Sequence, residues 1–177
     1  MKPPTIRRGV VADAAALASF AARTFYETFA AHNRPENMHA HLTSAYGEEQ
    51  QARELADPDV ATLLVHDSES LIAYAQVRRS PPPPCVVRER PIELRRFYID
   101  RAFHGGPVAP VLMRAVRGVA REFGGRHLWL GVWEHNPRAQ AFYRKQGFVD
   151  VGSTVFHVGS DRQADRVFVA PIAPETT

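Results

Sequence analysis

Residues 132–148 read VWEHNPRAQAFYRKQGF, and this run constrains the fold more than any other part of the chain. The apolar stretch before it predicts a strand that leads directly into Asn136-Pro137, a helix start with asparagine as N-cap and proline in the first turn. Apolar side chains then recur at helical spacing, and Gly147 stands where the helix would be C-capped. Asn136 and Tyr143 are about two turns apart, so both side chains can point toward the end of the strand.

The spacing V-x-x-x-N-x-x-A-x-x-F-Y-x-x-x-G-F resembles the acyl-CoA half of the GCN5-related N-acetyltransferases (GNAT). The segments TFYETFAAHN, LWLGVWEHN and GSDRQADRVFV resemble the bacterial polyamine (spermidine/spermine, PaiA-type) branch of that family. The resemblance implies a GNAT fold, with acetyl-CoA as co-substrate and an amine as acceptor.

The composition favours one globular domain over residues 1–177, since 45% of the residues are hydrophobic. Cys85 is the only cysteine, which excludes a disulfide framework and suits a reducing cytosol. No secretory signal and no membrane helix are visible, so we expect a cytoplasmic protein without a membrane partner. The net charge of +3 is small and the basic residues are dispersed, which does not suggest a nucleic-acid partner.

Periodicity and turn signals predict the elements in order. We expect a strand over 5–10, helices over 14–29 (capped by Asp13), 35–42 and 48–55, strands over 60–66, 71–78 and 92–99, a helix over 111–123, a strand over 127–132, a helix over 137–145, and strands over 148–158 and 166–170. The proline-rich segment 80–91 is expected to be a loop. This order predicts an α/β (mixed α+β) fold with a single mixed, mostly antiparallel sheet of about seven strands, flanked by helices.

The segment HGGPVA, residues 104–109, lies between an expected strand and an expected helix. A glycine-rich loop before a helix directs backbone N–H groups and the positive end of the helix dipole at an anion, although an ordinary helix-capping turn would look the same. In the family this place reads Q/R-x-x-G-x-G/A and holds the coenzyme A pyrophosphate. The resemblance therefore assigns cofactor binding to His104, Gly105, Gly106, Pro107, Val108 and Ala109. His104 and Pro107 depart from the motif, and Pro107 lacks an N–H donor.

The resemblance also implies roles for the strand and the helix on either side of this loop. Tyr143 would protonate the coenzyme A thiolate, and Asn136 would hydrogen-bond the pantetheine chain. The backbone of Phe97, Tyr98 and Ile99 would pair with pantetheine as an added strand does. Taken alone, Tyr143 fits a packed core tyrosine better than a catalytic one, and a plain N-cap at Asn136 is compatible with the pantetheine role.

A protonated amine, with a pKa of about 10.4, needs a base before it can attack a thioester. Residues 92–99 read IELRRFYI, and period two places Glu93, Arg95, Phe97 and Ile99 on one face. Glu93 is the candidate base; a surface carboxylate or an ion pair with a neighbouring arginine is the alternative. Polyamine-type relatives often carry an acidic residue where Arg95 stands.

The acceptor pocket is expected at Tyr26, Phe29, His32 and Trp133, with a mixed aromatic core as the alternative for Phe29. The cysteine and histidine spacing indicates no metal site. We therefore expect an acetyl-CoA-dependent N-acetyltransferase that acts on a small primary amine, with polyamines first, by direct transfer in a ternary complex. Another amine (an amino acid, an antibiotic or a protein N-terminus), an acyl-CoA-binding protein with little catalysis, and a homodimer stay open.

Overall fold

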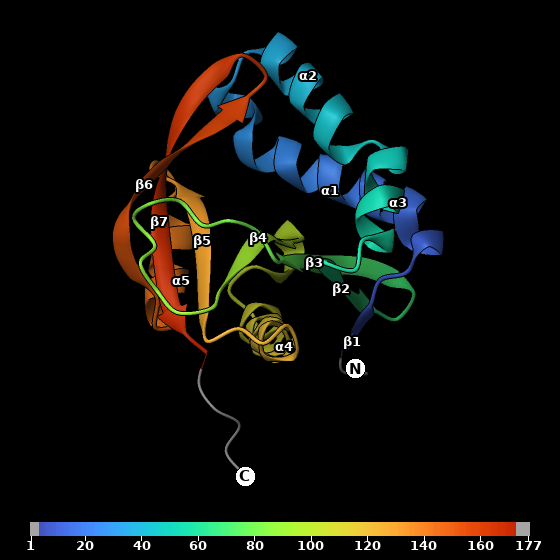
Figure 1. Ribbon diagram of the computed structural model, residues 1–177. Helices are drawn as coiled ribbons and strands as arrows, with labels where there is room; N and C mark the ends of the chain where they lie inside the picture. Colours follow the sequence, from blue (N-terminus) through green and yellow to red (C-terminus); the bar gives the residue numbers. More distant parts are fainter. Residues whose placement is uncertain (1–3, 173–177) are drawn as a thin grey trace.

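In the computed structural model, which describes residues 4–172, seven strands form one sheet in the order β1-β2-β3-β4-β5-β7-β6 (Figure 1). The strands are β1 (Thr5–Arg8), β2 (Val60–Asp67), β3 (Ser70–Arg78), β4 (Pro91–Ile99), β5 (His127–Trp133), β6 (Val149–Val158) and β7 (Asp161–Pro171). All neighbours pair antiparallel except β4 and β5, which are parallel. This confirms the predicted α/β fold with its mixed, mostly antiparallel sheet. The ends of the domain expected over 1–177, residues 1–3 and 173–177, lie outside the described residues.

The helices cover the two faces of this sheet (Figure 1). Helices α1 (Ala14–Phe29), α2 (Pro35–Tyr46) and α3 (Glu48–Ala56) lie on one face, where α1 and α2 share a core with β2, β3 and the end of β6. Helices α4 (Val108–Glu122) and α5 (Pro137–Lys145) pack on the opposite face in the largest core cluster. The proline-rich segment before β4 has no regular structure and covers β5 and β7 on the α1 face, through a small cluster around Trp129 and Val86.

Several expected boundaries, and the expected cap of α1, were wrong. Helix α4 begins at Val108 rather than at residue 111, because Pro110 falls in the first turn, where no N–H has an intrahelical partner. Strand β7 begins at Asp161 rather than at residue 166, and pairs with β6 from there. Asp13 makes no side-chain cap of α1; its carboxylate accepts a hydrogen bond from the Val10 backbone N–H and pairs with Arg7.

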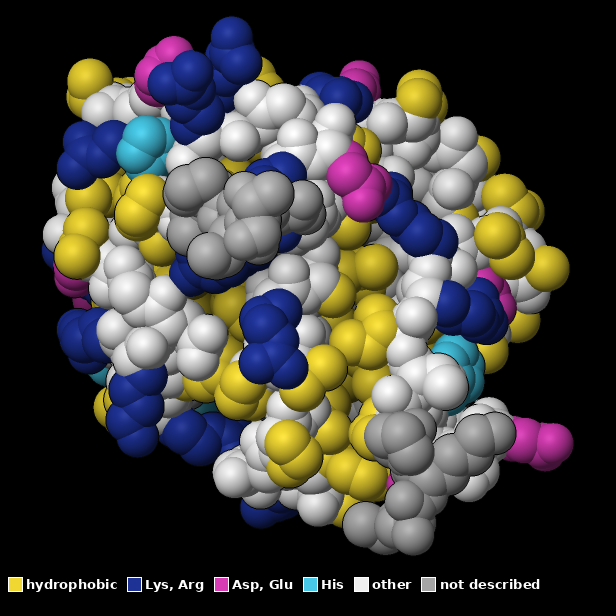
Figure 2. Space-filling view, turned by 90° about the horizontal axis from the view of Figure 1, so that it is seen from below, with side chains coloured by type: hydrophobic (Ala, Val, Ile, Leu, Met, Phe, Trp, Pro, Cys, Tyr) yellow, Lys and Arg dark blue, Asp and Glu magenta, His cyan; other side chains and the backbone are white. Residues whose placement is uncertain are grey.

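The face seen from below in Figure 2 shows how charge is distributed. Lysine and arginine side chains are spread among hydrophobic and uncharged groups instead of gathering in one patch. None of the helices within residues 4–172 is long and apolar enough to cross a bilayer.

A β-bulge interrupts β4 in its middle. Gln76 of β3 lies opposite Arg96 and the next residue, Val77, lies opposite Leu94, so Arg95 is the extra residue on β4. An extra residue reverses the alternation of side chains that follow it. The expectation that Glu93, Arg95, Phe97 and Ile99 share one face is therefore wrong.

After the bulge, the side chains of β4 point to the opposite face of the sheet from the one expected. Phe97 and Ile99 pack against the same core cluster as Leu94, on the α4 side of the sheet. Arg96 is buried and Tyr98 packs against the α1 and α2 cluster. The bulge thereby turns the Arg96 guanidinium toward α3. Without the bulge, the Arg96 side chain would point into the core under α4.

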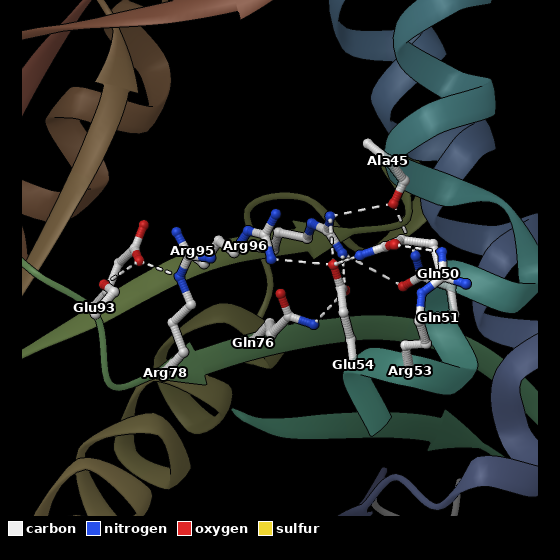
Figure 3. A network of polar contacts seen from close by, with 11 residues as sticks. Ala45, Gln50, Gln51, Arg53, Glu54, Gln76, Arg78, Glu93, Arg95 and Arg96 are labelled. Atoms are coloured by element: carbon white, nitrogen blue, oxygen red, sulfur yellow. Dashed lines mark hydrogen bonds and ion pairs between the residues drawn. The ribbon is translucent and has the colours of Figure 1, made fainter. Parts of the chain in front are cut away.

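The carboxylate of Glu54 on α3 receives this guanidinium (Figure 3). Arg96 donates from Nη1 to Oε2 at 2.7 Å and Arg95 from Nη1 to Oε1 at 3.1 Å, while Gln76 and Gln50 each donate at 2.9 Å. Burial alone would raise the pKa of Glu54, but Arg96, the two glutamines and Arg95 together lower it below its ordinary value. The Glu54 carboxylate thus holds α3 to the bulged part of β4.

We expect Glu54→Gln to lower the free energy of unfolding by about 3 kcal/mol, because it leaves the buried Arg96 charge without a counter-ion. Denaturant unfolding followed by circular dichroism measures this. Glu49→Gln is the matched control, because Glu49 pairs with Arg53 at the surface and such pairs contribute little. An equal effect of the two substitutions would contradict the role of Glu54.

Candidate active site

Strands β4 and β5 separate shortly after they meet. Their parallel pairing covers Pro91, Ile92 and Glu93, opposite His127, Leu128 and Trp129, and within the described sheet the later residues of β4 do not pair with β5. A cavity of about 430 Å³ occupies the opening, which we call the cleft. Of the residues predicted from sequence, those lining it are Phe29, Glu93, Phe97, Tyr98, Ile99, His104, Trp133, Asn136 and Tyr143.

A smaller hollow of about 290 Å³ adjoins the cleft at Ile99 and His104, and His32 lines it. The remaining predicted residues line neither space. Tyr26 is 55% exposed on α1, and residues 105–109 lie at the start of α4. The geometry therefore gives no support to an acceptor role for Tyr26.

Tyr143 lies in the cleft because of how α5 ends. The helix stops in a Schellman motif: Gly147 adopts φ +83°, its N–H donates to the Arg144 carbonyl, and the Phe148 N–H donates to the Tyr143 carbonyl. The Phe148 ring then packs against the Tyr143 ring, with Phe97 on another side. Burial raises the pKa of the Tyr143 hydroxyl, so this group stays protonated at neutral pH and can donate its proton or a hydrogen bond.

Asn136 caps α5 as predicted, since its Oδ1 accepts from the Ala139 N–H at 3.1 Å. The cap fixes the start of α5 at the end of β5 and leaves the pantetheine role of Asn136 as a prediction. Two turns later, the same helix carries Tyr143 into the cleft.

His104 links the two sides of the opening. Its Nε2 lies 2.8 Å from the Ile99 carbonyl of β4, and its Nδ1 lies 2.6 Å from Nη1 of Arg138 on α5. A guanidinium only donates, so Nδ1 accepts and Nε2 carries the proton that is donated to Ile99. The imidazole is thereby committed to protein partners, and Arg138 brings the positive charge of this corner. Arg138 was not predicted from the sequence.

The two glycines of the loop before α4 differ in backbone conformation. Gly105 has φ +78°, which favours glycine, whereas a Cβ on Gly106 would meet only the Phe103 carbonyl at 3.4 Å. Pro107 is the N-cap, with φ −75°. The Val108 side chain is buried in the core, so only its backbone N–H can face an anion at the helix N-terminus.

Glu93 forms the ion pair that was the alternative to a catalytic role. Its buried carboxylate accepts hydrogen bonds from Arg78 Nε and, at 2.6 Å, from Ser80 Oγ. Its role as the base stays a prediction. Among residues 4–172, no group of three or more metal-ligating side chains is present.

The end of the cleft at which the sequence places the acceptor is aromatic. The Trp133 ring lies 5.8 Å from Phe29 and 5.0 Å from His32, measured between ring centroids. Phe25, His41 and Tyr46, which the sequence did not single out, line the same end. Asp165 of β7 also lines this end. It was not predicted from the sequence, because the strand expected over 166–170 begins just after this residue.

The family model for "Acetyltransferase (GNAT) family" matches residues 19–148. The chain belongs to this family. An uncharacterised N-acetyltransferase of Mycobacterium tuberculosis is 32% identical over 157 residues, which cover 89% of this chain and 96% of the relative. The GNAT resemblance of the sequence is confirmed, and the protein is an acyltransferase.

Solved structures share the fold. The PaiA N-acetyltransferase from Thermoplasma acidophilum, in complex with coenzyme A, has a TM-score of 0.74 at 18% identity and covers 96% of this chain and 99% of its own. Nourseothricin acetyltransferase has a TM-score of 0.56 at 28% identity and covers 66% of this chain and 68% of its own. At 18% identity, the likeness to the PaiA structure shows the fold and not the acceptor.

We expect Gly106→Glu to weaken acetyl-CoA binding by more than tenfold, because it places a carboxylate beside the expected pyrophosphate position and a tenfold loss needs only about 1.4 kcal/mol. Isothermal titration calorimetry measures the affinity. Gly106→Gln is the control, since it has nearly the same volume without the charge. Unchanged affinity in Gly106→Glu would place the phosphate site elsewhere.

Proposed function

We propose that this GNAT acetyltransferase moves the acetyl group of acetyl-CoA to a small primary amine, with polyamines first, by direct transfer in a ternary complex. The observation that carries the proposal is the composition of the cleft. One cavity contains the residues of the expected pantetheine side, Phe97, Ile99 and Tyr143, and the aromatic residues of the expected acceptor side, Phe29 and Trp133. Both substrates would therefore meet between β4 and β5.

The cofactor would lie along β4. Beyond Glu93 this strand has an edge that does not pair with β5 within the described sheet, which is the geometry that an extended amide chain can join as an added strand. The α4 N-terminus, with Arg138 nearby, would take the pyrophosphate. Coenzyme A in the PaiA neighbour supports this use of the fold.

Transfer would then follow from three groups of the chain. Backbone N–H groups of β4 stabilise the oxyanion as the amine attacks. Tyr143, which stays protonated, gives its proton to the departing thiolate. Cys85 lines neither cavity and lies beside β6, 4.0 Å from the Ser153 carbonyl, so its thiol is not placed to carry an acyl-enzyme in the cleft.

A second acceptor class has support of its own. Nourseothricin acetyltransferase, at 28% identity over two thirds of the chain, favours an antibiotic amine as the alternative. The amine panel that separates these classes contains spermidine, spermine, nourseothricin, free amino acids and a peptide with a free N-terminus. Release of the coenzyme A thiol, followed with a thiol-detecting reagent, gives kcat/KM for each. We expect spermidine and spermine to have the highest values; no turnover with any member would refute the proposed function.

We expect Tyr143→Phe to lower kcat by about 10²-fold with little change in acetyl-CoA affinity, because the ring and its packing remain while the proton donor is lost. Steady-state kinetics with the best amine of the panel and calorimetry with acetyl-CoA measure the two quantities. The melting temperature serves as the control for folding. An unchanged kcat would reduce Tyr143 to a packing role.

A further inference from the structure

Asp165 lines the cleft beside Trp133, at the end where the acceptor amine is proposed to bind. On β7 it is opposite Trp133 of β5 on one side and Thr154 of β6 on the other. Gly131, two residues before Trp133, lies against it: a Cβ at Gly131 would be 3.1 Å from Asp165 Oδ2. The missing side chain at Gly131 gives the carboxylate room at the wall of the cleft, which both residues line.

Asp165 differs from the other perturbed aspartates of the described chain. Asp13, Asp100 and Asp150 each pair with an arginine, and their pKa values are lowered. Within residues 4–172, Asp165 has no cationic partner at ion-pair distance. Burial, and then the charge of Glu134, raise the pKa of Asp165 to about 6. A carboxylate that is partly desolvated without a counter-ion is unfavourable, and a cationic ligand would remove the cost.

The surroundings of Asp165 suit an ammonium group. Its cross-strand neighbour Trp133 is surrounded by Phe29, His32 and His135, the last at 5.2 Å between ring centroids. Aromatic faces attract cations, most strongly those of tryptophan. An aromatic wall and an uncompensated carboxylate at one end of a cleft therefore provide both elements that recognise a protonated amine.

We propose that Asp165 binds the ammonium group of the acceptor amine and takes its proton, so that Asp165 rather than Glu93 is the general base. This inference rests on the proposed function and adds the residue that activates the acceptor. Glu93 is held by Arg78 and Ser80, so accepting a proton would cost it an existing ion pair. Asp165 breaks no interaction when it accepts one.

The proton balance of the reaction closes with this assignment. One ammonium proton passes to Asp165, and the nitrogen lone pair forms the bond to the thioester carbon. As the tetrahedral adduct collapses, the carbon–sulfur bond breaks and Tyr143 protonates the thiolate. The adduct nitrogen loses a second proton, which restores Tyr143, and Asp165 releases its proton to water. The products are an amide, a thiol and one proton.

The assignment predicts a specific pH dependence. The other charged or titratable groups that line the cleft and the hollow beside it, or lie at the rim, come from several elements. They are Glu134 and His135 after β5, Glu27 on α1, His32 after α1, His41 and Tyr46 on α2, Arg78 on β3, Glu93, Arg95, Arg96 and Tyr98 on β4, Arg101 and His104 between β4 and α4, and Arg138 and Tyr143 on α5. Asp165 must be ionised to act, so kcat/KM should fall as the pH drops through about 6. Glu134 raises this pKa, so Glu134→Gln should move the acid limb to lower pH.

The test compares Asp165→Asn, Glu134→Gln and Glu93→Gln with the wild-type protein, using the best amine of the panel. We expect Asp165→Asn to lower kcat/KM by about 10²-fold, to lose the acid limb, and to keep its acetyl-CoA affinity. Glu134→Gln should shift the limb, and Glu93→Gln should retain it. An acid limb that disappears in Glu93→Gln and persists in Asp165→Asn would overturn the proposal.

A stability measurement gives a readout independent of turnover. The folded-state pKa of Asp165 is raised, so its protonated form favours the fold below about pH 4, and this contribution is lost as the pH rises through about 6. Asp165→Asn should therefore melt above the wild type at pH 8, with the difference vanishing near pH 4. Wild-type turnover with unchanged activity in Asp165→Asn refutes this inference alone, whereas no wild-type turnover with any amine refutes the proposed function.

Discussion

The β-bulge at Arg95 is the feature on which the active site depends. A regular β4 would continue its alternation and could stay paired with β5 along its length. The extra residue bends and twists the strand, and pairing with β5 stops after Glu93. The opening left between two central strands is a cavity in the middle of the sheet, flanked by α5 on one side and by α1 and α2 on the other. A cleft in this position exists without any domain boundary.

Buried charge keeps the bulge in place, and it also separates structural carboxylates from a reactive one. Glu54 accepts two guanidinium groups and two amides, and Glu93 accepts a guanidinium and a hydroxyl. Both oxygens of Glu54 accept hydrogen bonds, and Oε2 of Glu93 accepts both of the bonds to that carboxylate. Asp165 lines the cleft, as Glu93 does, and has Glu134 as an acidic neighbour and Trp133 as an aromatic one. Glu93 and Asp165 line one cavity and Glu54 lies outside it, and the partners of each carboxylate distinguish the structural ones from Asp165.

Much of the fold could be predicted from sequence because its signals are local. The N-cap at Asn136, the glycine at 147 and the spacing of Tyr143 define α5 and direct it to the cleft, and the structure contains each of these. The bulge could not be predicted, since IELRRFYI reads as a regular strand and the register depends on β3. Asp165 was missed for a related reason: β7 extends to Asp161 only because β6 pairs with it there. These errors all lie in long-range pairing.

The contacts of His104 and the position of Pro107 account for both departures from the family's loop motif. His104 stands where the motif has glutamine or arginine, and its ring joins the Ile99 carbonyl to Arg138. The charge that an arginine at 104 would bring is thus supplied from α5. Pro107 brings no N–H, but as N-cap of α4 it has a fixed φ that suits a helix start, while Val108 and Ala109 keep the first-turn donors. In the proposed cofactor site, the pyrophosphate would therefore meet the start of α4 and the start of α5 together, which the His104 ring links through Ile99 and Arg138.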